Sequence, residues 1–187
     1  MALPLPATVV EMKKFSPVFD HSKDTGVDVF IQLATDQRKS VWATATAIKR
    51  GRSTRAAGLA PRGGSLHTLY AIGLIASLRS VNKGMVYKLT HGTRLPAVIV
   101  QVGDEAFAAG IRSLASGSNV DQFRAGRNFW NHLTKQLRRF KVTVEVLSED
   151  DRRIGSLKSW AIGTVIDSRE AADVPAVFQP DVVSMAG

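Results

Sequence analysis

The chain has 187 residues, of which 44% are hydrophobic, so it is long and apolar enough to form one domain with its own core. It contains no cysteine, which excludes a disulfide framework, thiolate-bound zinc and a cysteine nucleophile. The formal net charge is +9, which favours an anionic partner, with nucleic acid first among the candidates.

Residues 1–26 include three prolines and show no sustained period, which predicts an N-terminal arm with a short strand over Thr8–Lys13. Three runs rich in β-branched and aromatic residues, or in alternating Thr and Ala, then predict strands. They are Val27–Ala34, Ser40–Lys49 and Ser53–Ala60. Because short polar turns join them, we expect an antiparallel meander.

Ser65 is a suitable N-cap for a helix that is apolar on nearly all sides, a pattern typical of a buried helix. Asn82-Lys83-Gly84 predicts its end, and residues 85–95 are expected to be irregular. The continuous apolar run Ala97–Val102 predicts a strand that is covered on both faces. Asp104 would then start the next helix.

The C-terminal third predicts a basic helix over Val120–Phe140, an alternating strand over Lys141–Leu147 and a last helix over Arg152–Ile166. Residues 167–187 show no period and are expected to form a flexible tail. The predicted domain therefore spans residues 27–166.

The order of elements is three strands, a helix, a strand, two helices, a strand and a helix, and the long buried helix leads to an apolar strand that ends at Gly103-Asp104. This order resembles the ribonuclease H-like fold over about three quarters of the chain. The resemblance implies an α/β fold with a five-stranded mixed sheet flanked by helices. Its first three strands form an antiparallel meander, and helices link the other two.

Active members of that family hold two metal ions with four carboxylates, which neutralise the ions that activate water. By the resemblance, the fourth-strand carboxylate matches Asp104. The other three positions fall near Gln32, Thr68 and Lys158, none of which is acidic. Asp36 is the remaining candidate from the first strand. We therefore expect no resident metal and no cofactor, and a degenerate member that has lost its catalytic site.

Two basic groups are predicted to contact nucleic acid, because phosphate contacts need exposed Lys and Arg on one surface. The first group is Lys49, Arg50, Arg52, Arg55 and Arg62, and the second is Arg124, Arg127, Lys135, Arg138, Arg139 and Lys141. Trp130 is a candidate stacking platform for single-stranded bases. His67 is expected to be a hydrogen-bonded core residue.

The function predicted from the sequence is non-catalytic binding of DNA or RNA, which would suit a viral or mobile-element accessory factor in replication or transcription. One alternative is a protein-interaction module or homo-oligomer. Another is a divergent nuclease that uses Asp36, Asp104 and either Asp150 or Asp151. No apolar run reaches the roughly 18 residues of a membrane span and no signal peptide is recognised. We therefore expect no membrane partner and a soluble intracellular protein, in the cytoplasm of the host cell if it is viral.

Overall fold

The computed structural model describes residues 8–11, 26–49, 53–60, 65–91, 95–117, 127–148 and 150–173. Six strands and four helices lie within them. The strands are β1 (Thr8–Glu11), β2 (Val29–Asp36), β3 (Val41–Ile48), β4 (Ser53–Leu59), β5 (Ala97–Val102) and β6 (Lys141–Val146). The helices are α1 (Leu66–His91), α2 (Glu105–Ala115), α3 (Arg127–Leu137) and α4 (Arg152–Asp173).

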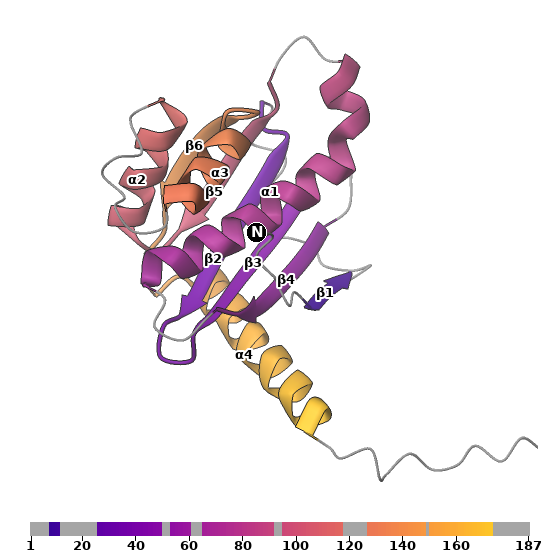
Figure 1. Ribbon diagram of the computed structural model, residues 1–187, viewed down its shortest axis with the longest axis vertical. Coiled ribbons are helices and arrows are strands. Elements are labelled where there is room, and N and C mark those ends of the chain that lie inside the picture. The colour runs from indigo at the N-terminus through magenta and orange to yellow at the C-terminus, as the bar shows by residue number, and fades with distance from the viewer. Residues whose placement is uncertain are drawn as a thin grey trace, which may run out of the picture.

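The strands form one mixed sheet in the order β1-β4-β3-β2-β5-β6. β2, β3 and β4 are the predicted antiparallel meander, while β5 and β6 continue the sheet in parallel to β2. The α/β class and the five-stranded mixed sheet are thus confirmed. β1 adds a sixth strand at the edge beside β4, where the short N-terminal strand pairs antiparallel (Figure 1).

The two faces of the sheet carry different helices. Val29, Ile31 and Leu33 of β2 point into the main core, which α1, α2 and α3 complete. The alternate residue Ala34 points to the other face, where it packs in a second core with α4. Figure 1 shows α1 crossing the near face of the sheet and α4 extending from the far one. This alternation follows from the two-residue period of a strand.

α1 is buried as predicted, but it is longer than its sequence signals suggested. Asn82-Lys83-Gly84 does not end it, and the helix continues to His91, through most of the segment expected to be irregular. The Asn82 side chain does not cap the helix but donates to Gln136 Oε1 of α3 at 2.8 Å. The packing of α1 on α3 therefore uses the polar residue that would otherwise favour a helix end.

α4 is also longer than predicted, and continues past Ile166 to Asp173. Residues 167–173 of the expected tail are thus helical, and residues 174–187 lie outside the described residues. Among the helices that the structure describes, none combines the length and apolar character needed to cross a membrane.

Candidate nucleic-acid interface

Acidic side chains gather at the edge of the sheet where its parallel strands end. Asp36 is the last residue of β2, Asp104 follows β5, and Asp151 lies between β6 and α4. Because β2, β5 and β6 run in parallel, their carboxyl ends share one edge. We call this edge the carboxyl edge. It carries Asp36 and Asp104, the two carboxylates that the sequence analysis kept as metal candidates.

Asp36 is neutralised by a lysine of the chain itself. Lys158 Nζ of α4 lies 3.6 Å from Asp36 Oδ2, and Lys39 N donates to Asp36 Oδ1 at 3.0 Å. Burial alone would raise the pKa of Asp36, but the hydrogen bond from Lys39 and the charge of Lys158 outweigh it and lower the pKa. Asp36 is therefore already paired with an ammonium group of the chain.

Asp104 acts as the N-cap of α2, as predicted, because its Oδ1 accepts from Phe107 N at 2.6 Å. The same oxygen lies 3.4 Å from His67 Nε2 of α1. The prediction that His67 is a core residue was wrong, since its side chain is 41% exposed and meets Asp104 at the surface. Thr68 turns to Ser65, whose Oγ accepts from Thr68 N at 3.2 Å.

The mid-strand position of β2 holds a buried amide instead of a carboxylate. Gln32 is only 5% exposed and lies opposite Gln101 of β5, which is equally buried. Gln101 Nε2 donates to Glu145 Oε2 of β6 at 2.9 Å, so polar side chains line up across three strands. Within the part of the chain that the structure describes, no three acidic or histidine side chains come together as a metal site.

Two further acids of the carboxyl edge, Glu105 and Asp151, also have basic partners. Glu105 accepts from Arg112 Nη1 at 2.8 Å, and Arg112 also donates through Nη2 to Val144 O on the outer edge of β6 at 3.0 Å. Asp151 accepts from Arg153 Nη2 at 2.6 Å. Four acids at this edge thus each have a basic partner from the chain.

We expect the Asp151→Ala variant to be less stable than the parent chain by about 1–2 kcal/mol at neutral pH. Asp151 Oδ1 caps α4 by accepting from Arg153 N at 2.9 Å, and the side-chain hydrogen bond from Arg153 lowers the pKa of Asp151 to about 2. A carboxylate with a lowered pKa stabilises the fold above the ordinary value of 3.8, and this contribution is lost as the pH falls towards 2. Urea unfolding at several pH values tests this, and a difference between the two proteins that is constant down to pH 2 would contradict it.

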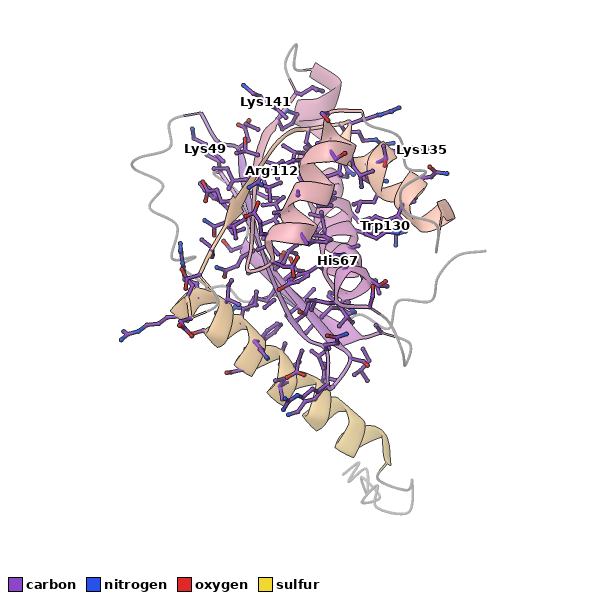
Figure 2. The ribbon with its side chains drawn as sticks, turned by 90° about the vertical axis from the view of Figure 1, so that its left-hand side faces the viewer. Lys49, His67, Arg112, Trp130, Lys135 and Lys141 are labelled. Carbon is purple, nitrogen blue, oxygen red and sulfur yellow. The ribbon has the colours of Figure 1, made fainter. Side chains whose placement is uncertain are left out.

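The opposite edge of the sheet, where β2, β5 and β6 begin, carries cations. Lys49 N donates to Asp28 O at 2.8 Å just before β2, and Lys141 N donates to Pro96 O at 2.9 Å at the start of β6. Asp28 N in turn donates to Ala97 O, so these residues form one continuous edge. Figure 2 shows Lys49, Lys135 and Lys141 towards one end of the molecule, away from His67.

Four exposed cations run from the last turn of α3 to the start of β6, and we call them the α3–β6 cations. They are Lys135, Arg138, Arg139 and Lys141. In the part of the chain that the structure describes, none of them forms an ion pair with an acidic side chain. They therefore differ from Asp36, Glu105 and Asp151 at the carboxyl edge, each of which lies beside a Lys or Arg of the chain.

The other residues that the sequence predicted to bind nucleic acid do not belong to this group of exposed cations. Arg55 of β4 is half-buried and lies over the Trp160 ring of α4 at 5.4 Å, and burial lowers its pKa. Arg127 is the first residue of α3. Arg50, Arg52, Arg62 and Arg124 lie outside the described residues.

Trp130, the predicted stacking platform, packs in the main core and is 7% exposed. A base needs an open ring face for stacking. The buried ring offers little of one, so Trp130 is not included in the interface proposed below.

Sequence reasoning missed two residues beside the α3–β6 cations. Arg79 of α1 reaches His132 of α3, with its Nη2 3.4 Å from His132 Nε2. Arg79 is exposed, whereas its neighbours Leu78 and Val81 on the same helix are buried. The signal in the sequence was a charged residue within the most apolar part of the helix, but only the packing of α1 on α3 shows what it faces.

Comparison with models of known protein families finds no match for this chain, and comparison with curated proteins finds none either. The function must therefore be argued from the residues and their arrangement.

Proposed function

We propose that this protein binds nucleic acid without cleaving it, on a scaffold of the ribonuclease H-like type. The strand order of the sheet, an antiparallel meander continued by two parallel strands, supports the choice of scaffold. A fold alone does not define a function, so the proposal rests on the distribution of charge.

The carboxyl edge gives little support to metal-dependent cleavage. Two-metal catalysis needs clustered carboxylates that are free to bind ions. Here Asp36 is bound by Lys158 and Asp104 by His67, while the buried Gln32 takes the place of an acid. The positive charge of Lys158 next to Asp36 would repel a divalent ion that approached the same carboxylate.

The observation that carries the proposal is the set of exposed α3–β6 cations, which have no acidic partner among the residues that the structure describes. Exposed cations on one helix face are often just a solvated surface, but such surfaces usually mix both signs. Asp36, Glu105 and Asp151 of the carboxyl edge pair with Lys or Arg at that edge, and none of them lies beside the α3–β6 cations. A phosphate backbone supplies the closely spaced negative charges that would match it.

The test is a titration of the full chain with single- and double-stranded DNA and RNA at about 50 mM and 200 mM salt, each with and without Mg²⁺. We expect binding that does not need Mg²⁺ and that weakens by roughly tenfold or more at the higher salt, because each phosphate contact releases counterions. Absence of binding to all four ligands would overturn the proposal. Cleavage that depends on Mg²⁺ and is lost in the Asp104→Asn variant would favour the nuclease instead.

A further inference from the structure

Three cations and one histidine meet where α1 packs on α3. His132, Lys135 and Arg139 are spaced three and four residues apart, so they lie along one side of α3 and the turn that follows it. Arg79 reaches them from α1, with its Nη2 3.4 Å from His132 Nε2. The hydrogen bond from Asn82 to Gln136, one turn further along both helices, holds the two helices in this register.

This arrangement is unfavourable in the free protein. Arg79, Lys135 and Arg139 repel each other and also oppose a positive charge on His132. α2, the other helix packed on α3, adds no charged group to this cluster among the described residues. Among the described residues, the cluster thus concentrates positive charge with no acidic side chain paired to it.

We propose that Arg79, His132, Lys135 and Arg139 form a binding site for a phosphate group of the nucleic-acid backbone, and that His132 takes up a proton when the phosphate binds. The inference rests on the proposed function and extends it to one subsite with its chemistry. A phosphate suits this site because its several oxygens can accept from donors on two helices at once. Arg139 also belongs to the α3–β6 cations, so a backbone bound there continues past Lys141.

The protonation of His132 follows from the same contacts. Burial lowers the pKa of His132, and the charges of Arg79, Lys135 and Arg139 lower it further, so the free imidazole is mostly neutral at neutral pH. A bound phosphate offsets those charges and raises the pKa of the imidazole, whose Nε2 then donates to the phosphate instead of accepting from Arg79 Nη2. By linkage, a ligand that raises a pKa binds more tightly as the pH falls.

The experiment measures the affinity of the full chain for a short single-stranded DNA between about pH 8 and pH 5.5 at constant ionic strength. We expect the parent chain to bind roughly tenfold more tightly at the lower pH, which corresponds to a pKa rise of about one unit on binding. His132→Gln should remove most of this difference, because glutamine cannot take up the proton. Arg152→Gln, an exposed site on α4, is the matched control for lost charge and should keep the pH dependence.

A second readout needs no nucleic acid. Nuclear magnetic resonance titration of the imidazole, assigned through the His132→Gln variant, should show the pKa of His132 rise when Arg79 is replaced by glutamine and when inorganic phosphate is added. If DNA binds but the parent and His132→Gln show the same pH dependence, the phosphate site is overturned and the proposed function stands. If no nucleic acid binds, both are overturned.

Discussion

Replacing Arg138, Arg139 and Lys141 together by glutamine should weaken nucleic-acid binding by on the order of 100-fold at low salt. The three side chains are exposed and have no acidic partner in the described part of the chain. Their replacement therefore breaks no ion pair among the described residues. The dependence of affinity on salt should also become shallower, by about two to three units in a log–log plot. Fluorescence anisotropy at several salt concentrations measures both effects.

The matched control removes the same charge from the carboxyl edge. Arg38, Lys39 and Arg152 are exposed there, and their replacement by glutamine lowers the net charge from +9 to +6, as the first triple substitution does. We expect this control to reduce affinity by only a few fold, through the general field of the protein. Equal losses in both triple variants would mean that net charge, and not the α3–β6 cations, governs binding.

Gln32→Glu should destabilise the protein by about 3–4 kcal/mol at pH 7. The substitution keeps the shape of a side chain that is 5% exposed, and replaces its amide by a carboxyl group. The nearest acid along the polar row is Glu145, which binds Gln101 and would repel a new negative charge. The introduced carboxyl should stay protonated in the folded protein but ionise freely in the unfolded chain.

The difference in protonation of the Gln32→Glu carboxyl group between the folded and unfolded protein fixes how the loss of stability changes with pH. An acid whose pKa is raised by folding costs little below its unfolded value of about 4.3, and the cost grows as the pH rises above it. Unfolding by urea at about pH 4.5 and pH 7 should therefore show the variant close to the parent only at the lower pH. Gln32→Met is the neutral control and should stay within about 1 kcal/mol, because Gln32 Nε2 has no hydrogen-bond partner among the described residues. A variant that Mg²⁺ restores at pH 7 would reveal a metal site at the carboxyl edge.

The sheet could be predicted because each strand carries its own pattern. The continuous apolar run in β5 predicts a strand covered on both faces, and β5 is buried along nearly all of its length. The alternation of Thr and Ala in β3 suits a half-exposed strand, but β3 is buried on both faces because α1 and α4 cover the sheet from opposite sides. The ends of α1 and α4 could not be predicted in the same way. Asn82 is a helix-ending signal in isolation, but in the fold it bonds to Gln136, 54 positions away. A tertiary contact of that kind leaves no local trace.

The sequence predicted that the candidate site is a basic surface, but not which residues meet there. Composition and the basic run after residue 120 indicated an anionic partner, and Lys135 and Lys141 are exposed as that requires. The pairing of Asp36 with Lys158 joins residues from the second strand and the last helix. The meeting of Arg79 with His132 likewise depends on how two helices pack. Such pairings depend on three-dimensional register, which a single sequence does not encode locally.

The contact between Arg112 and Val144 also bears on self-association. β6 is an outer strand of the sheet, and outer strands offer free backbone groups to which a second copy can add its own strand. The Arg112 guanidinium donates a hydrogen bond to the carbonyl of Val144 on the outer side of β6, and a second one to Glu105, which fixes its position. A second copy could pair its strand with β6 at this position only after the Arg112 side chain had left the carbonyl of Val144. At this strand, copies of the protein brought close together are thus protected from pairing edge to edge into an extended sheet.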